Sequence, residues 1–287
     1  MKTVTSKDNP VLKAARKLHT RKGREASGAF LIEGKKLIAE ASAAGFAVEH
    51  VFINAGALAR GEADGGINEI ALEERLFREL AGTVAPQPYM AVVRRPAVDG
   101  FRGGGIEAHD GGNIGGGANG RGECTKASGG GASYRALVLD RIGDPGNVGT
   151  MIRTALAAGM DAAWCLKGTA DVFSDKAIRA SAGAIFRLPA LEGLSAKDCV
   201  RLAAENGMRV LVCDASGADL YKTDLTGSFA LVAGNEGAGP QEELLEAAGA
   251  VIGIPMAAGV ESLNAAAAAA VVMYEARRQR AVGSEKL

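Results

Sequence analysis

Three points along the chain place polar side chains where an apolar run meets a turn and a helical pattern. At the first, residues 139–155, the apolar run ends at Asp140 and a turn from Asp144 to Gly146 follows. Asn147 is placed to cap the helix after the turn, and Arg153 stands near the second turn of that helix. Taken singly, a capping asparagine and a solvated arginine are the plainer interpretations.

The second point is a glycine-rich loop from Gly234 to Pro240, which follows an apolar run and contains Glu236. Its glycines permit positive φ angles and a close approach of the backbone to a ligand. The third point, Ile254 to Asn264, places Ser262 near the start of an alanine-rich helix, where helix capping by Ser262 is the plainer interpretation. The first point is neither a Walker loop nor a dinucleotide fingerprint, because GxxxxGK[ST] and GxGxxG are both missing there.

In this order, the three points resemble the three motifs of the SpoU/TrmH RNA methyltransferases. The first motif is Asp-Pro-Gly-Asn-x-Gly with an arginine six residues after the asparagine, the second is Gly-Asn-Glu-Gly-x-Gly, and the third is Ile-Pro-Met followed by Glu-Ser-Leu-Asn. A looser resemblance to the family's substrate-binding domain covers residues 2–95. It rests on Thr-Ser-x-x-Asn-Pro from Thr5 and on Gly-x-Phe-Leu-Ile-Glu-Gly from Gly28.

The resemblance implies a fold and a reaction. The fold is α/β, with a mostly parallel sheet, helices on both faces and a trefoil knot, which is an exception to the rule that chains do not thread. A smaller N-terminal α/β domain would bind the substrate. The family members are homodimers that bind S-adenosylmethionine in the knot and methylate a ribose 2′-hydroxyl, without a metal. We favour ribosomal RNA, because the basic N-terminal domain resembles those of the ribosomal branch, and transfer RNA stays open.

The resemblance also assigns roles to residues. Four would hold the cofactor, largely through main-chain groups: Gly234, Ile254, Met256 and Leu263. Five would form the reaction centre: Asn147, Arg153, Glu236, Ser262 and Asn264. A ribose hydroxyl is a poor nucleophile, so its proton must be removed or strongly polarised where water is excluded. In relatives the arginine that matches Arg153 is the proposed activating residue. Because arginine is normally charged, we assign it orientation and charge stabilisation, and a role as base stays open.

The elements that must position these motifs form a domain over residues 134–287. Apolar runs alternate with helical patterns there, which favours a largely parallel sheet covered by helices. The predicted strands cover residues 136–140, 162–166, 185–188, 209–213, 229–233 and 251–254. The predicted helices cover residues 148–158, 175–182, 196–206 and 241–247, and a long final helix begins near Leu263. Ligands of such sheets bind beyond the carboxyl ends of the strands.

Residues 1–98 are predicted to form a small α/β unit. We expect helices from Pro10, from Lys35 and over residues 72–80, and strands over residues 48–53 and 91–93. Cations are concentrated at its start, where only Asp8, Glu25 and Glu33 oppose Lys2, Lys7, Lys13, Arg16, Lys17, Arg21, Lys22, Arg24, Lys35 and Lys36. This basic cluster could follow a phosphate backbone, and a solvated helix face is the equally plain alternative.

Glycine dominates residues 99–133, with almost no large apolar side chain. Such a segment cannot bury enough surface to offset the entropy of ordering, so we interpret it as a flexible linker. A glycine-rich RNA-contacting tail is the alternative. It is the weaker one, because the stretch from Arg102 to Ser133 contains three cations and no aromatic residue that could stack on a base.

Composition excludes some classes of protein. Lys plus Arg and Asp plus Glu both number 33, so only local patches can indicate a nucleic-acid partner. The cysteines, at positions 124, 165, 199 and 213, lack paired spacing and lie far from the histidines, which argues against a zinc site and a disulfide framework. Cys165 and Cys213 are expected to act as small apolar residues in buried strands. The most apolar run, Ala265 to Met273, is too short to span a bilayer. We expect a cytoplasmic protein.

Three other functions compete with ribose methylation. An RNA-binding protein could keep the fold without the reaction, although the intact Arg153, Glu236, Ser262 and Asn264 argue against it. A methyltransferase of the same fold could modify a base, or a transfer RNA, instead. A nucleotide-dependent oxidoreductase is the weakest alternative, because its glycine fingerprint is missing.

Overall fold

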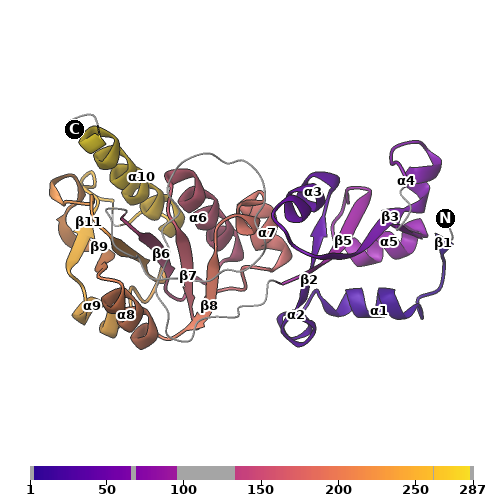
Figure 1. Ribbon diagram of the computed structural model, residues 1–287, viewed down its shortest axis with the longest axis horizontal. Helices are drawn as coiled ribbons and strands as arrows, with labels where there is room; N and C mark the ends of the chain where they lie inside the picture. The colour runs from indigo at the N-terminus through magenta and orange to yellow at the C-terminus, as the bar shows by residue number, and fades with distance from the viewer. Residues whose placement is uncertain (1–2, 66–68, 96–132, 261, 285–287) are drawn as a thin grey trace. The chain divides into compact units, whose positions relative to one another are not determined.

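The computed structural model describes residues 3–65, 69–95, 133–260 and 262–284 (Figure 1). The described chain forms two compact units, one containing the residues up to Arg95 together with residues 173–178, and the other containing the rest. Apart from Ser133, the predicted linker over residues 99–133 lies outside the described residues. The linker and the domain boundaries therefore stay predictions.

The first unit is built around a five-stranded sheet with the order β1-β4-β3-β5-β2. Its strands are β1 (Thr3–Val4), β2 (Ala29–Glu33), β3 (Val48–Asn54), β4 (Glu69–Leu72) and β5 (Tyr89–Arg94). Its helices are α1 (Pro10–Lys17), α2 (Arg21–Ser27), α3 (Lys35–Ala43), α4 (Ala55–Ala59) and α5 (Glu74–Ala81). β5 runs antiparallel to β2 and β3, whereas β4 runs parallel to β1 and β3. This mixed sheet is the small α/β unit that the sequence predicted.

Local sequence explains where the helices of this unit begin and end. α1 begins at Pro10 as predicted, because the Asn9 side chain accepts hydrogen bonds from the backbone N–H groups of Val11 and Leu12. The prediction of a helix over residues 72–80 was wrong at its start: Leu72 belongs to β4, where it pairs with Val4 and Asn54, and α5 begins at Glu74. The apolar residues at the end of β4 continue directly into the apolar pattern of α5, so the sequence does not show where the strand ends and the helix begins.

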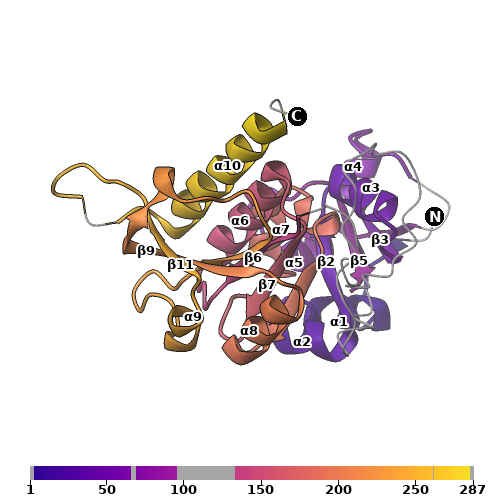
Figure 2. The same cartoon turned by 60° about the vertical axis from the view of Figure 1, so that its left-hand side comes forward.

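The second unit contains a six-stranded, fully parallel sheet with the order β11-β9-β10-β6-β7-β8. Its strands are β6 (Arg135–Leu139), β7 (Ala162–Leu166), β8 (Ala190–Leu194), β9 (Arg209–Asp219), β10 (Phe229–Ala233) and β11 (Ala250–Gly253). Its α-helices are α6 (Pro145–Ala158), α8 (Ala196–Glu205), α9 (Glu242–Glu246) and α10 (Ala265–Ser284), whereas α7 (Asp175–Ser181) begins in the first unit and ends in the second. Figures 1 and 2 show α6 and α10 on one face of the sheet and α8 and α9 on the other. The α/β class is confirmed, and the knot stays a prediction.

Burial on both faces explains why the central strands are continuous apolar runs. Every residue of β6, β7 and β10 is buried, as helices on both faces of a parallel sheet require. Trp164 in β7, the only tryptophan of the chain, is fully buried among the apolar side chains of the face covered by α8. Its fluorescence can therefore report whether the fold of this unit is intact. Within the described residues, no helix is both long and apolar enough to cross a membrane.

Two predictions about the strands of this unit were wrong. Residues 185–188 do not form a strand: Ala184–Phe186 is a short 3-10 helix that follows Gly183, a residue with a φ of +83°, and the strand is β8, at Ala190–Leu194. Three consecutive buried apolar residues have no period that separates a strand from a helical turn. Strand β9 also continues to Asp219, beyond the predicted end at Cys213, because its second half pairs with β11 after a break in register.

Candidate active site

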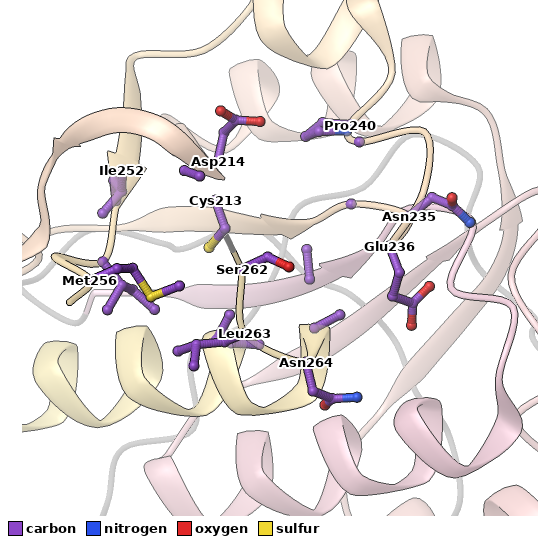
Figure 3. A pocket seen from close by; sticks show the side chains of 18 residues that line it. Cys213, Asp214, Asn235, Glu236, Pro240, Ile252, Met256, Ser262, Leu263 and Asn264 are labelled. Carbon is purple, nitrogen blue, oxygen red and sulfur yellow. The ribbon is translucent and has the colours of Figure 1, made fainter. Parts of the chain in front are cut away.

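A cavity with a volume of about 420 Å³ lies beside the carboxyl ends of β10 and β11 and the start of α10, with the middle of β9 in its wall (Figure 3). This is where the ligands of parallel sheets bind. Seven of the nine predicted site residues line the cavity: Gly234, Glu236, Ile254, Met256, Ser262, Leu263 and Asn264. The two others, Asn147 and Arg153, belong to α6. The structure therefore gathers the second and third motifs around one space.

Helix α6 brings the first motif to the mouth of this cavity. Its N-cap is Asp144, whose side chain accepts a hydrogen bond from the backbone N–H of Asn147, and Pro145 occupies the first helical position. The prediction that Asn147 caps this helix was therefore wrong, because an Asx turn one residue before the proline starts the helix earlier. Since Asp144 does the capping, the side chain of Asn147 is free to make other contacts.

The loop after β10 presents Glu236 toward α6. Gly234, its first residue, sits so close to the other arm of the loop that a Cβ there would come within 2.6 Å of the backbone nitrogen of Pro240. A larger residue would force the two arms of the loop apart, so the close approach of the two backbone segments requires a glycine at this position. Asn235 closes the loop, because its Oδ1 accepts hydrogen bonds from the backbone N–H groups of Gly237 and Ala238.

One hydrogen-bonded chain connects the three motifs. The Asn147 Nδ2 group donates to Glu236 Oε1 over 2.8 Å, and the Asn264 Nδ2 group donates to Asn147 Oδ1 over 3.2 Å. The Oδ1 atom of Asn264 in turn accepts from the backbone N–H groups of Ala266 and Ala267 and caps α10. Asn264, rather than Ser262, is therefore the capping residue of α10. Each amide is oriented by its partners, which fixes where the polar groups of the site point.

Arg153 is the one predicted reaction-centre residue that neither lines the cavity nor belongs to this hydrogen-bonded chain. Its side chain is exposed and makes no hydrogen bond or ion pair to any described residue. Six residues along an α-helix turn it by about 600°, or roughly 240° in net rotation. Arg153 consequently leaves α6 from a different side than Asn147 and does not face the cavity of its own chain.

Residues that sequence reasoning did not select also form the cavity wall. Cys213 and Asp214 in β9 line the cavity between its two ends. Cys213 was interpreted as a buried apolar residue, and it is partly exposed instead. Although the residue as a whole is partly exposed, its thiol group is surrounded by protein, and this desolvation raises the pKa of the Cys213 thiol to about 12, with a smaller contribution from the Asp214 carboxylate. The thiol is therefore neutral near pH 7. Their place at the middle of a strand that continues past the cavity is the reason that the prediction missed them.

The two ends of the cavity differ in chemistry. Ile252 and Met256 lie at one end in Figure 3, and Glu236 and Asn235 lie at the other, with Ser262 between them. In the described part of the chain, no three His, Cys, Asp or Glu side chains gather in a way that could hold a metal ion. The arrangement can hold an elongated molecule with an apolar part and present a hydroxyl to oriented amide and carboxylate groups.

Comparison with known proteins decides the family. Residues 134–274 match the SpoU rRNA Methylase family, and residues 9–91 match the MRM3-like substrate binding domain. The chain is 33% identical over 278 residues to the 23S rRNA (guanosine(2553)-2′-O)-methyltransferase RlmP of Bacillus subtilis (strain 168), a match that covers 96% of this chain and 100% of that protein. The chain belongs to the SpoU methylase family. The resemblance drawn from the three motifs is confirmed.

Solved structures agree with this SpoU methylase over nearly its whole length. The AdoMet-bound rRNA methyltransferase from Sinorhizobium meliloti is 29% identical with a TM-score of 0.76, and the match covers 96% of this chain and 97% of that one. The SpoU methyltransferase AviRb from Streptomyces viridochromogenes, in complex with AdoMet, is 28% identical with the same TM-score of 0.76, over 95% of this chain and 98% of that one. Both neighbours therefore share the two-unit architecture and bind S-adenosylmethionine.

Proposed function

We propose that this protein transfers the methyl group of S-adenosylmethionine to a ribose 2′-hydroxyl of ribosomal RNA. The observation that carries the proposal is the hydrogen-bonded chain of Asn147, Glu236 and Asn264, which joins three separate motifs at the mouth of one cavity. The relative RlmP, named as a 23S rRNA (guanosine-2′-O)-methyltransferase, matches this chain over its full length. Ribosomal RNA is therefore preferred over transfer RNA.

The residues present fit the proposed cofactor. The cavity volume of about 420 Å³ lies in the range of small-molecule sites. Ile254, Met256 and Leu263 would supply apolar surface to it, and the turn at Gly234, where a side chain does not fit, would leave main-chain groups open to it. When bound, S-adenosylmethionine supplies a methyl group on a positively charged sulfur. Ligand enclosure by these residues excludes water from the methyl group.

The polar end would prepare the hydroxyl. Methyl transfer forms a bond between the ribose oxygen and the methyl carbon, breaks the bond between that carbon and sulfur, and releases the hydroxyl proton. The amides of Asn147 and Asn264 and the hydroxyl of Ser262 can hold the ribose, and the Glu236 carboxylate keeps the Asn147 amide in one orientation. Holding the oxygen in line with the methyl group lowers the barrier by positioning alone.

The proposal includes a homodimer in which Arg153 serves the partner's cavity. The support is that Arg153 is exposed, lacks a partner among the described residues and leaves α6 away from Asn147. Co-expression of Arg153→Ala and Asn264→Ala chains tests it. About half of the dimers are then mixed, each with one intact site, which gives roughly a quarter of wild-type activity. A mixture no more active than either variant alone, with mixed dimers present, contradicts the shared site.

The first unit would hold the RNA through its basic cluster. Most of these cations already have partners: Lys7 and Arg16 pair with Glu79, Lys13 with Asp8, Arg21 with Glu25, Lys35 with Asp64, and Lys36 with Glu40. Arg24 is buried and donates to the Leu18 carbonyl. Lys17 and Lys22 are exposed and make no ion pair within the described residues. Exposed ion pairs are weak enough for a phosphate to replace them. Among the described cations of the cluster, Lys17 and Lys22 would bind a phosphate without such an exchange.

We also propose a cytoplasmic location, where ribosomal RNA is accessible. Mapping of ribose methylation in total RNA, with and without this protein, tests the whole proposal and identifies the nucleotide. The expected result is the loss of one 2′-O-methyl site in ribosomal RNA. If ribose methylation of ribosomal RNA is unchanged and a site in transfer RNA is lost, the substrate is transfer RNA. If ribose methylation is unchanged in all RNA, the proposed function is contradicted.

A further inference from the structure

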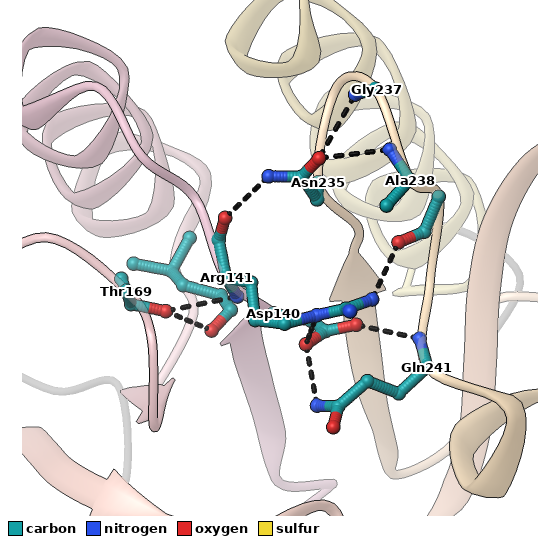
Figure 4. Close-up of polar contacts among 9 residues, drawn as sticks. Asp140, Arg141, Thr169, Asn235, Gly237, Ala238 and Gln241 are labelled. Carbon is teal, nitrogen blue, oxygen red and sulfur yellow. Dashed lines mark hydrogen bonds and ion pairs between the residues drawn. The ribbon is translucent and has the colours of Figure 1, made fainter.

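A second polar network lies beneath the loop that carries Glu236 (Figure 4). Its centre is Asp140, the residue after β6, whose carboxylate is fully buried. One oxygen, Oδ2, accepts the backbone N–H of Gln241 over 2.8 Å. The other, Oδ1, accepts the Gln241 Nε2 group over 2.7 Å and the Arg141 Nε group over 3.1 Å. Three donors therefore converge on one buried carboxylate, which gives it full compensation for the loss of water.

Arg141 ties the same loop at two other points. Its terminal guanidinium nitrogen donates to the Gly239 carbonyl over 2.9 Å, and its own carbonyl accepts the Asn235 Nδ2 group over 2.8 Å. Arg141 has a φ of +57°, a conformation that costs free energy for a residue with a side chain. Thr169 holds it there, because the Thr169 hydroxyl accepts the Arg141 backbone N–H and donates to the Leu139 carbonyl.

The loop from Gly234 to Gln241 is thus attached to the end of β6 at both of its arms. Asn235 is fixed by Arg141 at the start, and Gln241 is fixed by Asp140 at the end. Glu236 stands between these attachments, and its carboxylate must reach the Asn147 amide. Neither Asp140 nor Arg141 is among the described residues that line the cavity. They therefore do not contact a molecule bound there, and the loop is the part of the site that they hold directly.

We propose that Asp140 and Arg141 are positioning residues for methyl transfer, because they hold the loop from Gly234 to Gln241 in the shape that presents Glu236 to Asn147. The inference deepens the proposed function and rests on it for the role of Glu236. Asp140→Asn replaces one acceptor oxygen by an NH₂ group of nearly the same size. The three donors, which are the Gln241 backbone N–H, the Gln241 Nε2 group and the Arg141 Nε group, then share one acceptor oxygen. At least one of them points at the new NH₂ group, which is itself a donor.

The test compares Asp140→Asn with the double variant Asp140→Asn/Gln241→Glu, in which the new carboxylate can accept from the new amide. Amide hydrogen exchange of the loop, whose Gly237, Ala238 and Gly239 N–H groups bond to Asn235, measures its order directly. We expect Asp140→Asn to raise loop exchange and lower kcat by about tenfold each, with KM for RNA within about threefold. The double variant should recover at least a third of the lost kcat.

Controls separate this role from general stability. Asp198→Asn removes a carboxylate from the capping box of α8, far along the chain from the loop, and should leave loop exchange and kcat unchanged. Trp164 fluorescence checks that each variant is folded. If Asp140→Asn does not fold, Gln241→Met is the deciding variant. It removes the Nε2 donor and leaves the Asp140 carboxylate bonded to the backbone N–H of residue 241 and to Arg141. Loop exchange should then rise, and kcat should fall, each by about threefold.

A kcat loss in Asp140→Asn with wild-type loop exchange would overturn the proposal, and so would wild-type kcat or a double variant with no recovery. The proposed function fails in a different way. If Glu236→Gln has the wild-type kcat, Glu236 has no role in the reaction. Loop exchange in Asp140→Asn would still decide whether Asp140 and Arg141 hold the loop.

Discussion

The two ends of the cavity are built from different kinds of residue and are held in different ways. Ile252 and Met256 lie at the apolar end, Ile254 and Leu263 also line the cavity, and all four contribute apolar surface without polar side-chain contacts. At the polar end, Asn147, Glu236 and Asn264 fix one another by hydrogen bonds. Under the proposed function, this difference assigns binding of the cofactor and activation of the hydroxyl to separate residues. Substitutions should therefore change Kd at one end and kcat at the other.

The largest expected effect is that of Arg153→Ala. If Arg153 stabilises the developing charge as proposed, its loss should lower kcat by about 100-fold, which corresponds to about 2.7 kcal/mol, with Kd for S-adenosylmethionine within about twofold. Single-turnover methyl transfer and calorimetry measure the two quantities. Arg201→Ala on α8, another exposed arginine, is the matched control and should behave as wild type. A variant that keeps more than about a tenth of wild-type kcat contradicts the assignment.

Asn147→Ala should have the next largest effect. It removes both hydrogen bonds that join Glu236 to Asn264, so we expect kcat to fall by about 30-fold, or about 2 kcal/mol, with little change in cofactor affinity. Thr150→Ala on the same helix is the control, because the Thr150 side chain is exposed and only its backbone carbonyl is used. An Asn147→Ala enzyme that loses cofactor affinity and keeps its kcat would show that the two ends have been assigned the wrong way round.

Ile254→Ala addresses the apolar end. Removing three carbon atoms that the cofactor covers should weaken S-adenosylmethionine binding by about tenfold, and kcat at saturating cofactor should stay within about twofold. Isothermal titration and saturation kinetics give the two values. Leu245→Ala, an exposed apolar residue of α9 outside the cavity, is the matched control. A fall in kcat without a change in Kd would break the comparison between the two ends.

The smallest expected effect comes from the first unit. The Lys17→Glu/Lys22→Glu variant should raise KM for RNA by a few-fold, and the salt dependence of RNA binding should become shallower by about one to two units of slope. Filter binding across a salt series measures both. Lys197→Glu, an exposed lysine of α8, controls for net charge. RNA binding that is unchanged in the double variant would remove these two lysines from the RNA surface.

Much of the second unit could be predicted because its central strands, β6, β7 and β10, are fully buried. β7 and β10 occupy the predicted residues without error, since both faces of a parallel sheet demand unbroken apolar runs bounded by turns. The errors fell where the apolar pattern does not distinguish a strand from a helix. The three apolar residues of the 3-10 helix at Ala184–Phe186 are too few to show a period, and the continuation of β9 depends on its pairing with β11. The cap of α6 was predicted at Asn147 and lies at Asp144, because several adjacent residues could accept the same backbone N–H groups. The alternative that Ser262 caps α10 is also wrong, since Asn264 does so.

The candidate site was predictable from motif order, and its internal contacts were not. Seven predicted residues line one cavity because strand ends of a parallel sheet meet at the same edge. The hydrogen bonds from Asn147 to Glu236 and from Asn264 to Asn147 span 89 and 117 residues of sequence, so no local pattern reveals them. Asp140 and Gln241 are 101 residues apart in the sequence, so their contact could not be predicted from the sequence for the same reason.

The most direct test of the central claim is methyl transfer from labelled S-adenosylmethionine to ribosomal RNA, followed by digestion to nucleosides. The wild-type protein should place the label on a 2′-O-methyl ribose, and Asn147→Ala should lose nearly all of that label while Thr150→Ala keeps it. Label on a base, or equal ribose labelling by Asn147→Ala and the wild type, would contradict the claim that the Asn147, Glu236 and Asn264 end of the cavity activates a ribose hydroxyl.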